Sequence, residues 1–444
     1  MVPRNSLKRT LPLALLALCL GAGCNGSDNT EEGVGGEAVS LENVPVPPAN
    51  GPKLASVDKA TPIFERPALD ATKIGEMRAG AAVARAEEPI SKEGCPGGWY
   101  PINPRGFVCA GQDATTNLGH PTLAVMKTLP ARQGPLPYRY YSVKKQTSLY
   151  EWDRAKGAAV REVAKLRSRT RLAVVGSWSA QLPEGGTAKL AMLPDGRFVN
   201  AEHLEESTGS DFAGSVLDDK NQLPIAYIVK NGIRAWEVDG KNATKADRLD
   251  PLTMVPLTGR FRTIGGVKFW ATNDGRYVRH PDVTAIRRRD GMPDFVTGDQ
   301  KWIDISVITG TLVMYEGKKP VFATLCSVGH DRLGDPETGP TTAMGTFIIE
   351  AKHLTTSEPG KKPFAEEHEV FDAPWAQMMS SGQMIHGAMW HSRFGIEHGP
   401  GNVQLSPADA ARLFAWTSPA IPEGWHSVLK LADGEQKVIV HIRK

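Results

Sequence analysis

The sequence predicts a mainly β protein built from several domains, and three observations lead to this fold class. The chain has 444 residues, enough for about two to four domains of ordinary size. Glycine (45 residues) and proline (33 residues) are both abundant, which favours a turn-rich chain over a helical one. From about residue 52 onward, the apolar residues fall in short runs bounded by turn residues, a pattern typical of β-strands.

The composition is that of a soluble globular protein. Hydrophobic residues make up 41% of the chain and charged residues 23%, with a mean hydropathy of −0.29. The formal net charge is only +3, whereas a dedicated nucleic-acid binder concentrates more positive charge, so we exclude nucleic acid as a partner. We interpret the one dense basic run, residues 287–289, as the solvated face of a linker between domains.

The N-terminus has the pattern of an export signal. Arg4, Lys8 and Arg9 precede an apolar stretch from Leu11 to Leu20. Because a membrane-spanning helix needs about 20 apolar residues, this shorter stretch indicates a signal peptide over residues 1–24 and not an anchor.

The end of this segment resembles a bacterial lipobox. Small residues at 21–23 precede Cys24, which would become the lipidated first residue of the mature protein. We therefore expect a lipid-anchored protein of the periplasm or cell envelope, with the membrane as a partner through this lipid. Asn25 favours the outer membrane of a Gram-negative cell. Ordinary cleavage with free release is the alternative.

The composition of residues 25–51 and the positions of the cysteines also agree with export. The segment 25–51 is rich in Gly, Asn, Glu and Pro, which predicts a flexible tether. Cys95 and Cys109 are close in sequence, and in an exported protein such a pair predicts a disulfide. Cys326 would then be the odd thiol, and we expect it to be a buried, inert residue.

A weak internal repeat divides the next part of the chain into three modules, 52–112, 140–206 and 224–290. Each copy begins with a strand-like run that contains an aromatic residue, continues to a β-branched run, and closes with a turn followed by an aromatic–valine pair. The closing pairs are Phe107-Val108, Phe198-Val199 and Tyr277-Val278. Small barrels of this kind resemble bacterial SH3-like domains, which often accompany cell-wall enzymes. The alternative is that these strands form a scaffold without a ligand.

The last part of the chain, 300–444, has a different pattern. Alternating residues at 302–309, 312–315 and 320–328, separated by turns, predict an antiparallel meander. Near the end, Ser406-Pro407 with Asp409 predicts the start of a helix that reaches Trp416, because Ser caps a helix and Pro fits its first turn. One or two short helices in a β-sandwich or barrel are therefore expected.

This region resembles the L,D-transpeptidase (YkuD-type) catalytic domain. The resemblance begins with the opening meander at 305–329. A "TTAMGTF" loop follows, which is similar to the family's ATPxGTF with Ala343 in place of Pro. Two further segments match, "IHGAMWHSRFG" and "LSPADAARLFAW". The order and spacing of these motifs carry the resemblance. It implies peptidoglycan stem peptides as substrate and no cofactor.

The resemblance also implies the site residues. His386 falls on the general base, and Gly387 provides a backbone group that would orient it or contact the intermediate. Trp390, His391, Phe394 and Gly395 match a local pattern that would line the substrate pocket. The family uses a cysteine thiolate, which attacks the stem-peptide carbonyl to form a thioester.

The nucleophile is missing from this sequence. Without a gap between Gly395 and Leu405, the motif glycine falls on Gly401 and the catalytic cysteine on Asn402, while the motif's Ser and His fall on Gly399 and Pro400. An amide nitrogen is no practical nucleophile because its lone pair is delocalised. We therefore expect a degenerate transferase domain that still binds peptidoglycan.

Two other hypotheses stay open at this stage. One is an enzyme with transpeptidase activity or slow peptidase activity, by an altered mechanism in which Asn402 positions a water and His386 is the base. The other is a structural protein whose SH3-like modules bind peptidoglycan. A metal site formed by His386, His391 and His398 is disfavoured because the spacing suits no single helix face, so we predict no metal.

Overall fold

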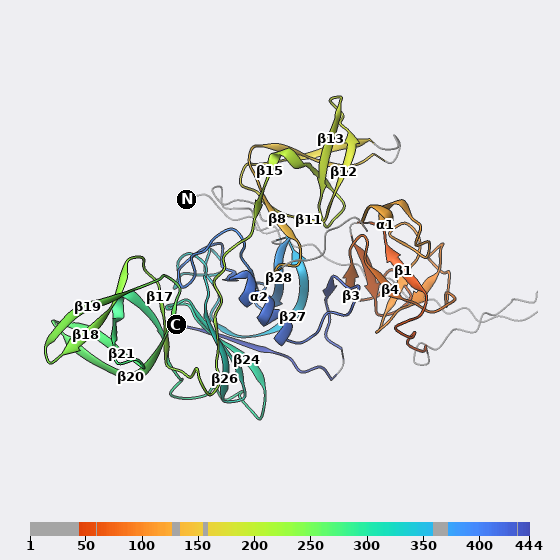
Figure 1. Ribbon diagram of the computed structural model, residues 1–444. Helices are drawn as coiled ribbons and strands as arrows, with labels where there is room; N and C mark the ends of the chain where they lie inside the picture. The colour runs from red at the N-terminus through yellow and green to blue at the C-terminus, as the bar shows by residue number, and fades with distance from the viewer. Residues whose placement is uncertain (1–43, 59, 127–133, 154–158, 358–371, 433) are drawn as a thin grey trace, which may run out of the picture. The chain divides into compact units, whose positions relative to one another are not determined.

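The computed structural model describes residues 44–444 apart from 59, 127–133, 154–158, 358–371 and 433. Residues Val44–Lys444 form one compact unit that is mainly β, as expected from the sequence (Figure 1). The predicted signal peptide, the lipidation site Cys24 and most of the predicted tether lie outside the described residues. The last residues of that tether are in contact with the first module, because the carbonyl of Pro47 accepts a hydrogen bond from Asn103 Nδ2 at 2.8 Å.

Within the described ranges, no helix is both long enough and apolar enough to cross a membrane.

The first module, which covers the predicted range 52–112, contains seven short strands. They are β1 (Lys53–Ser56), β2 (Thr61–Phe64), β3 (Lys73–Met77), β4 (Ala82–Ala84), β5 (Trp99–Pro101), β6 (Phe107–Cys109) and β7 (Ala114–Thr115). A one-turn-and-a-half helix, α1 (Pro121–Met126), follows.

The second and third modules each combine strands with one short 3-10 helix. The second contains β8 (Arg139–Val143), β9 (Thr147–Trp152), β10 (Val160–Leu166), β11 (Arg171–Val174), β12 (Gly176–Gln181), β13 (Thr187–Met192), β14 (Phe198–Asn200), η2 (Ala201–His203) and β15 (Leu204–Ser207). After β16 (Ser215–Val216), the third contains β17 (Ile225–Ile228), β18 (Ile233–Asp239), β19 (Asn242–Leu249), β20 (Met254–Ile264), β21 (Val267–Thr272), β22 (Tyr277–Arg279), η3 (His280–Asp282) and β23 (Val283–Ile286).

All three modules share one scheme of strand pairing. In each, the first strand pairs antiparallel with the fourth and with the last: β1 with β4 and β7, β8 with β11 and β15, β17 with β20 and β23. In each, the second strand pairs with the third and with the strand that carries the aromatic–valine pair. The repeated sequence segments therefore adopt the same connectivity, while their resemblance to SH3-like domains stays a prediction.

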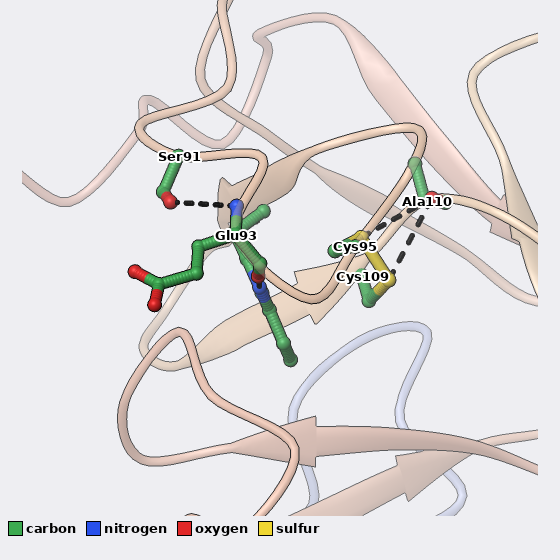
Figure 2. The surroundings of a disulfide bond; sticks show 6 residues. Ser91, Glu93, Cys95, Cys109 and Ala110 are labelled. Atoms are coloured by element: carbon green, nitrogen blue, oxygen red, sulfur yellow. Dashed lines mark hydrogen bonds between the residues drawn. A yellow bond between two sulfur atoms is a disulfide. The ribbon is translucent and has the colours of Figure 1, made fainter.

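Cys95 and Cys109 are joined by a disulfide with 5.7 Å between their Cα atoms (Figure 2). Cys109 ends β6, where it is the register partner of Trp99 in β5. The bond closes a loop of about 15 residues, which contributes roughly 3 kcal/mol by restricting the unfolded chain. The first module therefore gains covalent support that partly offsets its small core.

The C-terminal domain is a sheet whose strands do not follow chain order. Its elements are β24 (Lys301–Ser306), β25 (Thr311–Glu316), β26 (Lys319–Leu325), β27 (Gly345–Thr356), β28 (Ala373–Met379), β29 (Met384–Gly387), β30 (Val403–Leu405), α2 (Pro407–Trp416), β31 (Ser427–Val428) and β32 (Ile439–Arg443). The predicted meander is β26–β25–β24, which β32 extends in parallel and β27, β28 and β29 then continue in antiparallel order. The parallel pair β29–β30 completes the domain.

Two strand ends differ from the sequence prediction. The first strand ends at Ser306 and the third at Leu325, three residues earlier than expected in each case. Cys326 N donates to the carbonyl of Gly310 at 2.8 Å, which is the last bond of the ladder, because the partner chain turns at Gly310 with a φ of +60°. The residues after Leu325 instead run beside the segment that leads into β30.

Helix α2 begins where the sequence predicts. Ser406 is the N-cap, and its Oγ accepts a hydrogen bond from Asp409 N at 3.2 Å. At the other end, the buried Lys352 donates from Nζ to the carbonyls of Phe414 (2.6 Å) and Thr417 (2.8 Å). The helix is therefore held at both ends, directly after β30, and it packs against β28 and β29.

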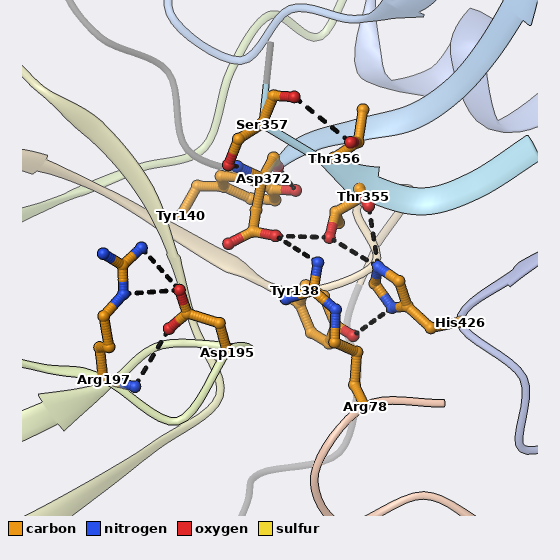
Figure 3. Close-up of polar contacts among 10 residues, drawn as sticks. All are labelled: Arg78, Tyr138, Tyr140, Asp195, Arg197, Thr355, Thr356, Ser357, Asp372 and His426. Carbon is orange, nitrogen blue, oxygen red and sulfur yellow. Dashed lines mark hydrogen bonds and ion pairs between the residues drawn. The ribbon is translucent and has the colours of Figure 1, made fainter. Parts of the chain in front are cut away.

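A buried polar cluster fixes the end of β27 and the start of β28 (Figure 3). Thr355 Oγ1 donates to Asp372 Oδ1 at 2.9 Å, and Arg78 Nη2 lies 3.6 Å from the same oxygen. His426 Nε2 contacts the carbonyl of Thr355 at 2.8 Å. Burial raises the pKa of Asp372 and lowers the pKa of His426 well below its usual range. The cluster anchors the hairpin that leads to β29.

The basic run at 287–289 is not simply a solvated face. Arg289 Nη1 lies 2.6 Å from Asp304 Oδ1, and Asp304 is only 3% exposed. Arg443 pairs with the same carboxylate at 2.9 Å. The linker is held here because β24 places a buried carboxylate within its reach, and two guanidinium groups compensate the charge of that carboxylate.

Candidate active site

The candidate site is built on the parallel strands β29 and β30. Ile385 pairs with Val403, His386 with Gln404 and Gly387 with Leu405. The strands are formed by short apolar runs that enter the largest core cluster through Ile385, Val403 and Leu405. Residues 388–402 form the loop between them. The site therefore places the predicted base on one strand and the predicted nucleophile position just before the other.

His386 is fully buried, and its ring lies beside two groups that orient it. Its Nδ1 is 3.0 Å from the carbonyl oxygen of Gly387. Because a carbonyl can only accept, Nδ1 carries the hydrogen, and the lone pair of the neutral ring is on Nε2. The ring of Trp390 lies 5.6 Å away at an interplanar angle of 30°. This tautomer is the one that a general base of this kind requires.

Asn402 lies at the start of β30 and bonds across to β29. Its Oδ1 accepts a hydrogen bond from the backbone N–H of Met384 at 3.0 Å. Because β29 and β30 are in parallel register, Asn402 is diagonal to His386, two residues from the partner Gln404. The structure thus places the predicted base and the predicted nucleophile position on neighbouring strands, two residues apart along the pair.

Gly401 occupies a position that only glycine fits. Its φ is +104°, and an added Cβ would lie 2.7 Å from Gln383 Nε2 and 2.8 Å from the carbonyl oxygen of Thr341. Its own carbonyl accepts a hydrogen bond from Thr342 Oγ1 at 2.8 Å. The loop that resembles ATPxGTF therefore packs directly on the segment that would carry the nucleophile.

Gln383 holds that loop in place. Its Nε2 donates to the carbonyl of Thr341 at 2.8 Å, and its Oε1 accepts from Ala343 N at 2.9 Å. The side chain is 9% exposed, so both hydrogen bonds are shielded from water. Sequence reasoning missed Gln383, because its partners are about 40 residues away and no local pattern marks it.

His391 is fixed by hydrogen bonds at both ring nitrogens. Its Nδ1 accepts from Arg393 N at 3.2 Å, and its Nε2 lies 2.7 Å from Gln404 Oε1, to which it donates. The ring stacks on that of His398 at 4.1 Å. Burial, together with the nearby His398, lowers the pKa of His391 to about 4, so the ring is neutral at pH 7.

Gln404 is a second site residue that sequence reasoning missed. It is 2% exposed, lies opposite His386 in the strand register, and bonds to His391. A signal was present, because the family motif continues Cys-x-Asn/Arg and Gln404 falls on that last position. An amide here can orient His391 without adding a charge beside His386.

Phe394 and Gly395 do not line a pocket. Phe394 is 2% exposed and belongs to an apolar cluster, where its ring stacks on Phe212 at 5.7 Å. Gly395 has a φ of +85°, and its N–H donates to the carbonyl of Cys326 at 3.1 Å. We correct their assignment: these two residues turn and anchor the loop, whereas Trp390 and His391 remain half-buried beside His386.

Cys326 is buried in the largest core cluster and is 0% exposed. Burial raises the pKa of its thiol to about 12, so the group is neutral at physiological pH. A neutral, inaccessible thiol is neither a nucleophile nor a metal ligand. Among the residues that the structure describes, no group of three or more His, Cys, Asp or Glu side chains is placed to hold a metal ion.

The strand pair β29–β30, the buried His386 and the loop around Thr341 lie together in the C-terminal β-domain, next to residues 401–402. Residues 300–440 match the sequence profile of the YkuD L,D-transpeptidase catalytic domain. The resemblance predicted from the motifs is therefore confirmed for this region. The match leaves the three upstream modules outside it.

Solved structures that match part of the chain include an L,D-transpeptidase from Xylanimonas cellulosilytica, at 16% identity over 35% of this chain and 64% of that one, with a TM-score of 0.23. A second is from Stackebrandtia nassauensis, at 19% identity over 34% and 60%, with a TM-score of 0.22. L,D-transpeptidase 1 from Mycobacterium tuberculosis matches at 20% identity over 42% and 82%, with a TM-score of 0.23.

The chain spans less than two thirds of the first two of these structures. No curated protein matches the chain.

Proposed function

We propose that this protein is a cell-envelope protein whose L,D-transpeptidase-like domain binds peptidoglycan stem peptides without forming an acyl-enzyme. The observation that carries the proposal is the position of Asn402. At the head of β30, diagonal to His386, its side-chain oxygen accepts a hydrogen bond from Met384 N at 3.0 Å. The place that a thiolate would need is occupied by an amide.

The chemistry of the family explains why this matters. The base takes the proton of a cysteine thiol, and the sulfur attacks the stem-peptide carbonyl. The tetrahedral intermediate then collapses to a thioester as the terminal D-amino acid leaves with the proton from the base. An amine of a second stem or a water next attacks the thioester and frees the thiol. An amide nitrogen cannot begin this sequence because its lone pair is delocalised into the carbonyl. His386 keeps its orientation in β29 but has no thiol to deprotonate at residue 402.

Cys326 does not replace the missing nucleophile. It is 0% exposed in the core, and burial raises the pKa of its thiol to about 12. The other cysteines of the sequence are at residues 19, 24, 95 and 109, all upstream of the domain, and the last two are joined in the disulfide. The domain therefore lacks a reactive thiol.

The surroundings of residue 402 still offer groups that recognise a peptide. Trp390 presents an aromatic ring beside His386. His391 is oriented by hydrogen bonds to Gln404 and Arg393 N, while burial keeps its ring neutral. Because His391 is already oriented before a ligand arrives, binding costs less conformational entropy. Polar and aromatic groups without a nucleophile suit a binding or regulatory module.

Location in the envelope is a further part of the proposal, and it is supported by the N-terminal sequence alone. Labelling cells with radioactive palmitate should mark the wild-type protein, and Cys24→Ser should abolish the label. A wild-type protein without label, found free in the periplasmic fraction, would contradict the lipid anchor but would leave the binding function intact.

The decisive experiment is intact-mass spectrometry after incubation with a carbapenem, a reagent that acylates the cysteine of this family. We expect no adduct on the wild type and one adduct per chain on Asn402→Cys. Asn402→Ser is the matched control, since it changes the same position without adding a thiol. An adduct on the wild type would overturn the proposal, and peptide mapping would then identify the nucleophile.

Binding is measured separately by calorimetry with a purified tetrapeptide stem. We expect saturable binding to the wild type, with no release of D-alanine over hours. Trp390→Ala should weaken binding by roughly tenfold, on the scale of a lost aromatic contact. Release of D-alanine by the wild type would support the hypothesis of an enzyme with an altered mechanism. An absence of binding would favour the hypothesis that the upstream modules are the part that binds peptidoglycan.

A further inference from the structure

The hairpin β20–β21 of the third module extends beyond the core that supports its base. Leu257 and Trp270 are buried in the module's apolar cluster, but residues 258–263 of β20 are all exposed. The hairpin turns at Gly265 and Gly266, with φ values of +57° and +77°. Two consecutive positive φ angles make the tight turn that matches the twist of paired strands. Figure 1 shows β20 and β21 side by side.

The charge of this hairpin is one-sided. Between Asp250 and Asp274 the sequence carries three basic residues and no acidic one, although the net charge of the whole chain is only +3. The three are Arg260, Arg262 and Lys268, which all lie near the tip. Arg260 and Arg262 are exposed. A local excess of this kind attracts anions, and the attraction acts within about 10 Å at ordinary salt.

Apolar side chains lie among these cations. Phe261 is 53% exposed, and Lys268 Nζ lies 3.8 Å from the centre of its ring. Ile264 and Val267 are paired across the turn and are half-buried. The tip of the hairpin therefore presents an aromatic ring and two aliphatic groups, with a cation near each of them.

The strand register places these groups on both faces of the hairpin. Phe261 pairs with Trp270 and Thr263 with Lys268, so these four share one face, whereas Arg262, Ile264, Val267 and Phe269 share the other. A small ligand needs polar groups that converge in a concave site. A projecting tip with cations and apolar groups on both faces is suited instead to insertion into an extended phase, which contacts both faces at once.

We propose that the tip of the β20–β21 hairpin, residues 260–268, docks into the surface of an anionic lipid bilayer. Phe261, Ile264 and Val267 enter the boundary between headgroups and acyl chains, where an aromatic ring is stable. Arg260, Arg262 and Lys268 pair with lipid phosphates, because their long stems let the charge stay in the headgroup layer. This contact does not depend on the residues around Asn402.

The test is co-sedimentation of the compact unit Val44–Lys444 with vesicles, so that the N-terminal segment does not contribute. Vesicles of phosphatidylglycerol and phosphatidylethanolamine should bind the protein, and vesicles of phosphatidylcholine alone should not. The triple variant R260Q/R262Q/K268Q should bind the anionic vesicles at least tenfold more weakly. Phe261→Ser should weaken binding several-fold. In the wild type, vesicles should protect the hairpin from proteolysis, and Phe261→Ser should abolish that protection.

A variant with the same charge change controls for net charge. K241Q/K245Q/R248Q removes three exposed cations from the neighbouring hairpin β18–β19 and should retain most of the binding. Equal losses in both triple variants would overturn the hairpin-specific contact, as would undiminished binding by R260Q/R262Q/K268Q with an unchanged melting temperature. Binding to purified peptidoglycan sacculi but not to vesicles would overturn the bilayer and assign the tip to an anionic wall polymer.

Discussion

The strands β29 and β30 lie side by side in parallel, yet they differ in what they keep of the transpeptidase pattern. In β29, His386 and Gly387 are the residues predicted for the base and its neighbour, and the contact of 3.0 Å between His386 Nδ1 and the Gly387 carbonyl fixes the imidazole tautomer. At the head of β30, the expected Ser-His-Gly-Cys is replaced by residues 399–402, which read Gly-Pro-Gly-Asn. Only the motif glycine survives there.

The difference shows which part of the site the fold itself requires. His386 is fully buried, and Gly387 lies close to Pro374 and Ala410, so changes in β29 would disturb the packing of α2 and β28. Gly401 is kept for a similar reason, because no side chain fits beneath the Thr341 loop. Asn402 is only half-buried, and its side-chain oxygen accepts a hydrogen bond from Met384 N. Packing therefore constrains residue 402 less than it constrains His386, Gly387 and Gly401.

The largest effect is expected on the rate of acylation once a thiol has been introduced at residue 402. In the Asn402→Cys background, His386→Ala should lower the rate of carbapenem acylation by about 10²–10⁴-fold, the usual contribution of a general base. Stopped-flow measurement of β-lactam absorbance gives this rate. An unchanged rate would mean that His386 does not reach the thiol, and that β29 preserves a shape without a function.

The two thiols of Asn402→Cys sharpen the comparison between the site and the core. At pH 8, iodoacetamide should modify Cys at residue 402 at least 100-fold faster than Cys326, because burial raises the pKa of the Cys326 thiol to about 12. Peptide mapping after a time course distinguishes the two. Unfolding in guanidinium should make the two rates similar; a Cys326 that reacts quickly in the folded protein would contradict its place in the core.

Gly401 tests whether packing alone preserves a motif residue. Gly401→Ala should lower the free energy of unfolding by about 3 kcal/mol, because the new Cβ would meet both Gln383 and the Thr341 carbonyl at a positive φ. Gly275→Ala is the control: its φ is +83°, but no atom lies within 4 Å of an added Cβ, so we expect about 1 kcal/mol. Urea denaturation measures both, and equal losses would remove the packing argument.

The hydrogen bond of Asn402 should have a smaller effect. Asn402→Ala leaves the N–H of Met384 without its partner, and we expect the free energy of unfolding to fall by about 1 kcal/mol. Asn402→Asp keeps an acceptor oxygen and should lose less than Asn402→Ala at pH 7. If both substitutions were neutral, the amide would not be what holds the head of β30 to β29.

The smallest expected effect is a change in pH dependence. Burial lowers the pKa of folded His391 to about 4, below the ordinary value of 6.5, so the unfolded chain takes up the proton first as the pH falls. The contribution of His391 to stability is therefore complete above about pH 6.5 and is lost towards pH 4. Thermal melts at pH 7 and pH 4.5 should show a smaller loss for His391→Gln than for the wild type. Equal losses would show that His391 does not carry this dependence.

Much of the fold could be read from local pattern, because strands and helix ends are specified by neighbouring residues. The aromatic–valine pairs lie in β6, β14 and β22, and Ser406 caps α2 as its sequence predicts. The boundaries were less predictable. The third strand of the meander ends at Leu325 because its partner β25 begins at Thr311, after a turn at Gly310, and Ser327 then bonds to Gln404, a contact that no local pattern contains.

The sequence by itself determined that residues 399–402 read Gly-Pro-Gly-Asn, that Cys326 is the one cysteine of residues 300–444, and that Ile-His-Gly is present at 385–387, since a motif with fixed spacing needs only residue identity. Tertiary structure alone decided what those residues contact. Gln404 holds His391, Gln383 holds the Thr341 loop, Phe394 belongs to the core, and Asn402 bonds to Met384. These contacts join residues that are 13 or more positions apart or depend on burial. Hydrogen bonds and close packing act over a few ångströms in space, and the distance along the chain does not reveal them.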